Sequence, residues 1–203
     1  MNSLFKEIDG QNPLILASAS PRRKRLLEQA CLPFEIVVSR IREEATEGLA
    51  PADLCLGLAR EKAMDVSSRI RPSWILGADT IVVLGDRILG KPADRQDALN
   101  MLSLLSGKVH RVITGFCILT PSGIVAHVET VSTSVTVKEL GGDERKAYVD
   151  TGEPFGKAGG YAIQGIGSFM VESISGSYTN VVGLPLCAVI KALRKAGALE
   201  KFP

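Results

Sequence analysis

The sequence is poor in the residues that most often bind metals or stack on nucleic-acid bases. It has two histidines and four cysteines among 203 residues, and aromatic residues make up 5%. Each histidine and cysteine lies in a segment of its own: His110, His127, Cys31, Cys55, Cys117 and Cys187. A zinc site is not expected, because its ligands usually come in close pairs. The cysteines lie among apolar neighbours, and we expect them to be reduced and buried.

Excess charge and long apolar runs are also missing. Lys and Arg number 24 and Asp and Glu 22, a formal net charge of +2, which is too little for general electrostatic binding of nucleic acid. Only the cations at residues 22–25 favour such a partner, so none is expected. Uncharged stretches such as residues 112–128 are interrupted by Gly, Ser, Thr and Pro, so no transmembrane helix or membrane partner is expected. Residues 1–12 lack the apolar core of a signal peptide, which favours a cytoplasmic protein.

What is present fits a globular protein, with 45% apolar and 23% charged residues. We find no repeat or linker and predict one domain, residues 1–203, with 1–12 as an N-terminal extension. Strand and helix patterns interleave and hairpins are frequent, which predicts an α/β fold with a mixed sheet and flanking helices. Strands are expected at 14–18, 34–38, 74–84, 87–89, 109–119, 124–137, 161–164 and 169–172, and helices starting at Pro21, Pro51, Asp94, Asp143 and Pro185.

The first candidate binding segment follows the first predicted strand. Ser18 and Ser20 precede a helix that starts at Pro21 with four consecutive cations, although a helix N-terminus carries partial positive charge. Lys24 and Arg25 are interpreted as a solvated helix face. Hydroxyls, free backbone N–H groups and the guanidinium groups of Arg22 and Arg23 converge there, a combination that suits a phosphate group.

Asp79 is the second candidate, because it lies in the middle of the most apolar strand. Burying an unpaired carboxylate there costs several kcal/mol. We therefore expect Asp79 to be paired with a cation, to bind a metal or to lie at an open cleft. Lys62, four residues after Leu58, lies on or beside an apolar helix face, and Lys91 follows the predicted hairpin. Taken alone, each lysine is better explained by its aliphatic stem packing on the surface. Their combination with Asp79, Arg22 and Arg23 is what favours a functional role.

Gln164 is a polar amide within a strand pattern. Its side chain offers a donor and an acceptor and could read a nucleobase edge, or it could be a core residue bound to backbone. The nearby glycines do not complete a known phosphate motif. GEPFGK at 152–157 has the wrong spacing for a P-loop and no Ser or Thr after its lysine, and Met170 replaces the third glycine of a dinucleotide fingerprint.

Taken together, these segments resemble the Maf family, in order and over nearly the whole chain. The resemblance rests on six segments: SASPRR at 18–23, AREKA at 59–63, GADTIV at 77–82, GKP at 90–92, IQG at 163–165 and NVVGLP at 180–185. It implies a fold related to the inosine triphosphatases, with an elongated twisted mixed sheet and two lobes around a cleft. It also implies an enzyme that cleaves a nucleoside triphosphate to its monophosphate and pyrophosphate with a divalent metal, Mg²⁺ or Mn²⁺.

The resemblance also implies roles for individual residues. Asp79 would hold the metal and activate water, with Glu43 as a second acidic ligand, while Lys62 and Lys91 would steady the triphosphate. Substrate binding would fall to Ser18, Ser20, Arg22, Arg23, Thr80 and Gln164. The segment before Glu43, SRIR at 39–42, departs from the family, whose members often carry acids there.

The forms of Arg22, Thr80 and Gln164 resemble the branch that acts on dTTP and UTP, which predicts a house-cleaning pyrophosphatase for these and modified pyrimidine triphosphates. Two alternatives stay open: a 7-methyl-GTP pyrophosphatase, and a non-catalytic nucleotide-binding regulator of septum formation. A homodimer is a hypothesis by analogy.

Overall fold

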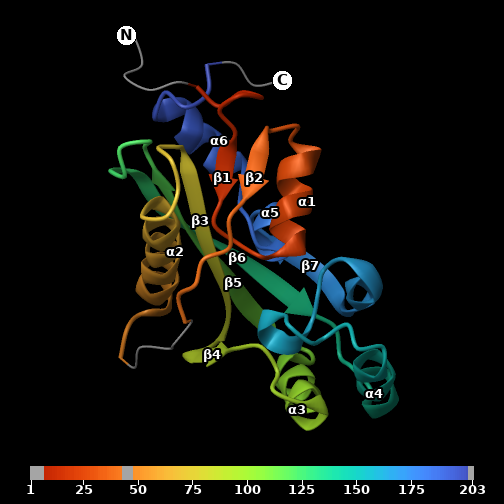
Figure 1. Cartoon of the computed structure of the whole chain (residues 1–203). Coiled ribbons are helices and arrows are strands. Elements are labelled where there is room, and N and C mark those ends of the chain that lie inside the picture. The colour runs from red at the N-terminus through yellow and green to blue at the C-terminus, as the bar shows by residue number, and fades with distance from the viewer. Residues whose placement is uncertain (1–6, 43–47, 201–203) are drawn as a thin grey trace. The chain divides into compact units, whose positions relative to one another are not determined.

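The computed structural model describes residues 7–42 and 48–200. Its strands form one seven-stranded mixed sheet in the order β2-β1-β3-β5-β6-β7, with β4 paired to β3, and helices flank it (Figure 1). The predicted α/β class with a mixed sheet is thus confirmed. The strands are β1 (Leu14–Leu16), β2 (Phe34–Ile36), β3 (Ile75–Leu84), β4 (Arg87–Leu89), β5 (Val109–Leu119), β6 (Val125–Val137) and β7 (Val171–Ser175).

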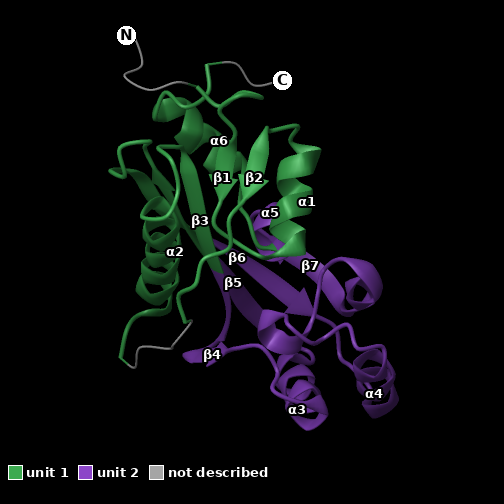
Figure 2. Ribbon diagram, in the orientation of Figure 1, with its two compact units in different colours: residues 1–79, 114–131, 183–203 green, residues 80–113, 132–182 purple. Residues whose placement is uncertain are grey.

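The chain divides into two compact units, coloured separately in Figure 2. Unit 1 comprises residues 1–79, 114–131 and 183–203, and unit 2 comprises residues 80–113 and 132–182. The helices of unit 1 are α1 (Pro21–Gln29), α2 (Pro51–Ser67) and α6 (Leu186–Lys195); those of unit 2 are α3 (Arg95–Leu105), α4 (Gly142–Asp150), α5 (Tyr178–Val182) and the 3₁₀ helices η1 (Ala158–Gly160) and η2 (Gly165–Met170).

The N-terminal part of unit 1 consists of parallel strands connected through helices. Strand β1 pairs in parallel with both β2 and β3, because α1 and α2 return the chain to the same edge before each new strand. One cluster of its buried side chains comes from these strands, from α2 and from β5, and comprises Ile15, Ala17, Ala63, Val66, Ile75, Cys117 and Leu119. This packing fixes the strand ends near which the candidate residues of unit 1 lie.

Unit 2 packs α3 and α4 around a second core that includes Leu102, Val112 and Tyr148. The NVVGLP segment begins here with Asn180, which is fully buried. Its side-chain amide donates hydrogen bonds of 2.9 Å to the Val112 carbonyl and to Thr133 Oγ1. Asn180 is therefore part of the internal scaffold of unit 2, linking α5 to strands β5 and β6.

The glycine-rich segment differs most from the sequence prediction. The strand expected at 161–164 is absent from the described residues. Helices η1 and η2 flank this segment, and Gly159, Gly160 and Gly165, just outside it, adopt φ angles of +71°, +67° and +74°, so the chain turns sharply on both sides of a short extended stretch. Strand β7 starts at Val171 instead of residue 169, and the short helix α5 was not predicted. No helix in the described part of the chain is long and apolar enough to cross a membrane.

Candidate functional site

Helix α2 lies unusually close to the sheet in unit 1, beside β3 (Figure 1). A Cβ atom placed on Gly77 of β3 would be 2.1 Å from the Ala59 carbonyl oxygen, and one on Gly115 of β5 would be 2.8 Å from the backbone of Cys55. Both distances are shorter than any normal contact. The two glycines therefore allow the backbone of α2 to lie directly against the sheet.

This close approach brings Lys62 to Asp79. Asp79 is two residues after Gly77 and so points to the same face of β3, while Lys62 is one turn after Ala59 on α2. Lys62 Nζ donates a hydrogen bond to Asp79 Oδ1 at 2.5 Å, and the side chains are only 8% and 10% exposed. Pairing with a cation is thus the environment the structure shows for Asp79, among those that the sequence left open. Removing either charge from such a pair typically costs about 3–5 kcal/mol.

Cys55 forms a hydrogen bond with the backbone of Asp79, a role that the sequence analysis missed. Its Sγ donates to the Asp79 carbonyl oxygen at 2.9 Å and accepts from the Gly115 amide at 2.9 Å. Cys55 is seven residues, or about two turns, before Lys62, so both point from α2 toward the sheet. This seven-residue spacing from Lys62 was the sequence signal that could have placed Cys55 beside the candidate site. The partners of Cys55 could not be identified, because Gly115 is 60 residues away in sequence.

None of the four cysteines forms a disulfide, and the expectation that all are buried is wrong for two of them. Cys55 and Cys117 are fully buried, whereas Cys31 and Cys187 are exposed. Burial raises the pKa of the Cys55 thiol to about 12, with the Asp79 charge adding to the effect, and burial raises that of Cys117 to about 11. Exposure at Cys31 follows from its place just after α1, where it takes a φ of +52°.

These environments predict selective thiol chemistry. Iodoacetamide at pH 8 should label Cys31 and Cys187 in the folded protein, while Cys55 and Cys117 should react only after denaturation. Cys55 and Cys117 are inaccessible to the reagent, and only a small fraction of each is in the reactive thiolate form. Peptide mass spectrometry with and without guanidinium chloride measures each site. Labelling of Cys55 in the folded protein at the rate of Cys31 would contradict the described packing of α2.

The loop before α1 is held by Ser18 and Arg23. Arg23 is 7% exposed; its Nη1 donates to Ser18 Oγ at 2.9 Å and its Nε to the Gly183 carbonyl at 2.8 Å. Ser18 Oγ also accepts from the Ser20 amide at 3.2 Å, and Ser20 caps α1 by accepting from the Arg23 amide at 3.5 Å. Gly183 belongs to the NVVGLP segment, so two of the segments singled out in the sequence meet here, in unit 1.

Arg22 is the half-buried cation at the start of α1. Burial lowers its pKa, and the neighbouring charge of Arg23 lowers it further. Two guanidinium groups this close favour an anion between or beside them, because an anion offsets their mutual repulsion. Lys24 and Arg25 are exposed, as expected for a solvated face.

The remaining predicted residues lie in unit 2 or outside the described part. Thr80 directly follows Asp79 on β3 and is half-buried, and Lys91 is exposed two residues after β4. Gln164 is half-buried and immediately precedes η2. Glu43 lies outside the described residues. Within residues 7–42 and 48–200, no group of three or more His, Cys, Asp or Glu side chains is placed to hold a metal ion.

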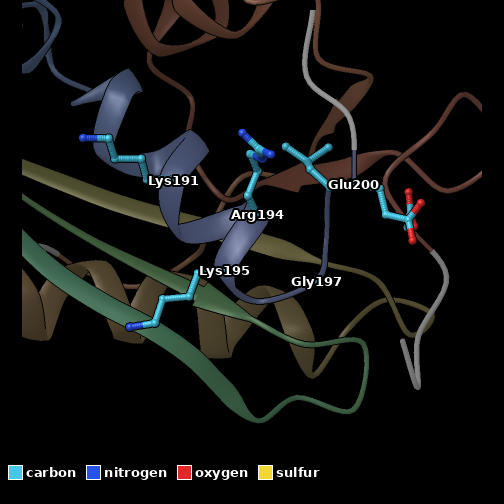
Figure 3. A pocket seen from close by; sticks show the side chains of 7 residues that line it. Lys191, Arg194, Lys195, Gly197 and Glu200 are labelled. Atoms are coloured by element: carbon cyan, nitrogen blue, oxygen red, sulfur yellow. The ribbon is translucent and has the colours of Figure 1, made fainter. Parts of the chain in front are cut away.

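A pocket of about 510 Å³ lies elsewhere in unit 1, at the end of α6 (Figure 3). Its cations are Lys191, Arg194 and Lys195, and the lysine ammonium groups point away from Arg194 in Figure 3. Cations at the end of a helix offset its partial negative charge. None of the predicted site residues that the structure describes lines this pocket, so it is separate from the candidate site.

The described groups of unit 1 are suited to phosphate chemistry: a carboxylate and an ammonium group buried as a pair, with a serine and arginine loop at a helix N-terminus in the same unit. They fit the broad class of phosphate-binding enzymes. The family model described as Maf-like protein matches residues 13–196, and the chain belongs to this family. The resemblance inferred from the six segments is therefore confirmed.

Several named proteins are similar to this chain over most of its length. Proteins named dTTP/UTP pyrophosphatase from Geobacter sulfurreducens and Geobacter metallireducens are 50% and 51% identical over 186 residues, covering 92% of this chain and 97% of each relative. One of the same name from Ruminiclostridium cellulolyticum is 50% identical, covering 90% and 95%. A solved dITP/XTP pyrophosphatase from Mycobacterium abscessus covers 63% of this chain and 74% of its own at 18% identity, with a TM-score of 0.35, which is too weak a likeness to bear on the fold.

Proposed function

We propose that this protein hydrolyses dTTP, UTP and modified pyrimidine triphosphates to the nucleoside monophosphate and pyrophosphate. The observation that carries the proposal is the buried Lys62–Asp79 pair of unit 1, a costly arrangement that a purely structural strand does not need. The names of relatives about 50% identical over most of the chain support the substrate class.

The donor set of unit 1 fits a hard divalent cation. Mg²⁺ in nucleotide sites is usually held by one or two carboxylates together with water and the substrate phosphates, so a cluster of three protein ligands is not required. Asp79 supplies one carboxylate, and Glu43 is proposed as a second. When bound, Mg²⁺ or Mn²⁺ would neutralise phosphate charge and lower the pKa of a bound water.

Side chains of the protein would supply the remaining positive charge and bind the phosphate oxygens. Lys62 orients Asp79 through their 2.5 Å hydrogen bond, and its ammonium group adds positive charge where the phosphate chain gains negative charge. Arg22, Arg23 and the hydroxyls of Ser18 and Ser20 are proposed to bind phosphate oxygens, with Arg23 also positioning Ser18 through the 2.9 Å hydrogen bond. Hydrolysis then depends on how the substrate is positioned and on how its negative charge is stabilised, which is the general basis of phosphoryl transfer.

Lys91, Thr80 and Gln164 of unit 2 are proposed to complete substrate recognition. Lys91 would bind a phosphate, and the amide of Gln164 would read the base through one donor and one acceptor. Thr80 is proposed to contribute to the same choice of substrate. We further propose a cytoplasmic location, where nucleoside triphosphates are made and used, and a homodimeric assembly, which light scattering tests.

A substrate panel with product identification tests this function. The purified protein is incubated with dTTP, UTP, CTP, GTP and 7-methyl-GTP, each with Mg²⁺, Mn²⁺ or EDTA, and products are separated by anion-exchange chromatography. We expect UMP with pyrophosphate from UTP, and no turnover with EDTA. UDP with orthophosphate would refute the reaction, preference for 7-methyl-GTP would refute the substrate class, and tight nucleotide binding without turnover would favour a regulator.

A further inference from the structure

The geometry points to Glu153 as a positioning residue that sets base selectivity by holding the turn after Gln164. This inference rests on the proposed role of Gln164 in reading the base. Glu153 Oε1 accepts a hydrogen bond from the Ile166 amide at 3.0 Å, and Oε2 accepts one from the Gly167 amide at 2.7 Å. One carboxylate thus binds two successive backbone N–H groups at the start of η2, which is a strong and directional arrangement.

The turn is shaped to receive this carboxylate. Gly165 has a φ of +74°, and a Cβ atom at this position would lie 2.2 Å from Glu153 Oε1. Only glycine therefore lets the chain pass so close to the carboxylate while turning sharply after Gln164. This contact is local to unit 2 and does not involve Asp79 or Lys62.

Glu153 is itself held in place at its backbone. Its amide donates to Thr151 Oγ1 at 3.1 Å, and Thr151 Oγ1 in turn donates to the Tyr148 carbonyl of α4 at 2.6 Å. Its carbonyl oxygen accepts from Lys157 Nζ. The 165–167 turn is thus connected through Glu153 to the end of α4, a regular element of the unit 2 core.

The charge state of Glu153 agrees with this role. Partial burial raises the pKa of its carboxyl, but hydrogen bonds, including those from the Gly167 and Ile166 amides, lower it more, so the net direction is downward. The group is ionised at neutral pH and can accept both amide hydrogen bonds at once. A neutral glutamine in its place has a single acceptor oxygen and would keep one of the two bonds.

The expected consequence concerns selectivity. Reading a base edge requires the Gln164 amide to stand in one position, and its backbone is fixed by the turn that follows. If the turn relaxes, hydrogen bonds to the correct base are lost, while contacts to phosphates, which every nucleotide shares, remain. Glu153 is proposed to touch neither base nor phosphate and to act through Gln164.

We would test this with Glu153→Gln, Glu153→Ala and Glu153→Asp beside Gln164→Ala, using kcat/KM for dTTP, UTP and GTP. Glu153→Ala should lower kcat/KM for dTTP and UTP roughly tenfold, mainly through KM, and leave the GTP value nearly unchanged, a loss in the range expected for one recognition contact. Glu153→Asp should restore part of the selectivity. Glu172→Gln, which changes an exposed carboxylate on β7, is the matched control and should change nothing.

Amide hydrogen exchange of Ile166 and Gly167 supplies a readout independent of activity, and both amides should exchange faster in Glu153→Ala. Equal loss of activity on all three triphosphates, with a lower unfolding temperature, would show a merely structural role and overturn the inference. Unchanged selectivity in Glu153→Ala while Gln164→Ala loses it would also overturn it. Unchanged selectivity in Gln164→Ala would instead refute base reading by Gln164, and this inference with it.

Discussion

Asp79→Asn should reduce the rate of dTTP and UTP hydrolysis by roughly 100- to 1,000-fold, the usual cost of removing one group that stabilises developing charge. Asparagine keeps the shape of the side chain but carries no negative charge for a divalent cation or for Lys62 Nζ, now 2.5 Å from Oδ1. Initial rates with pyrophosphate detection measure the effect. Asp65→Asn, which changes a half-buried carboxylate paired with Arg69 on the same unit, should keep full activity.

This variant also leaves Lys62 buried without its counterion, so reduced stability could account for lost activity. The double variant Asp79→Asn, Lys62→Met separates the two causes, because it removes both charges and fills the space with an apolar chain of similar length. We expect its free energy of unfolding to recover relative to the single variant while its activity stays lost. Recovery of hydrolysis in the double variant would show that Asp79 has no catalytic role.

Gly77→Ala should be the most destabilising small change in unit 1. The added methyl group would lie 2.1 Å from the Ala59 carbonyl oxygen and 2.9 Å from the Ala63 Cβ, and the first of these atoms is backbone that cannot rotate away. Helix α2 must therefore move from the sheet, at a cost of about 3 kcal/mol or more. Urea denaturation followed by circular dichroism measures the loss, and activity should fall as Lys62 moves away from Asp79.

The same helix offers a matched control. Gly57 is exposed on α2, and a Cβ atom there has no neighbour within 4 Å. Gly57→Ala should thus stabilise the protein by up to about 1 kcal/mol, because alanine is the better helix former. If both substitutions changed stability equally, the close packing of α2 at Gly77 would be wrong.

Much of this arrangement could be predicted from the sequence where local pattern or electrostatic cost was decisive. The α/β class followed from interleaved strands and helices, and strand β5 and the start of α2 match the predicted bounds. Asp79 drew attention because a carboxylate in an apolar strand is costly, and the structure pairs it with Lys62. The functional roles assigned to these residues remain predictions.

The features that sequence reasoning missed depend on distant or unusual backbone geometry. Cys55 binds groups of Asp79 and Gly115, which are 24 and 60 residues away, and a cysteine gives no sign of such partners. Glu153 resembles a solvated loop charge until the turn at Gly165 is known. The strand predicted around Gln164 was wrong, because glycines with positive φ angles turn the chain just before and just after this short extended stretch, which pairs with no strand among the described residues.

The most direct test is a crystal structure with Mg²⁺ and a UTP analogue whose α,β-bridging oxygen is replaced by nitrogen. We expect a cation about 2.1 Å from an Asp79 carboxylate oxygen and shared with a phosphate oxygen of the analogue, with Lys62 still beside Asp79. A triphosphate bound far from Asp79, with the Lys62–Asp79 pair closed and no ion next to it, would contradict a catalytic role for this pair.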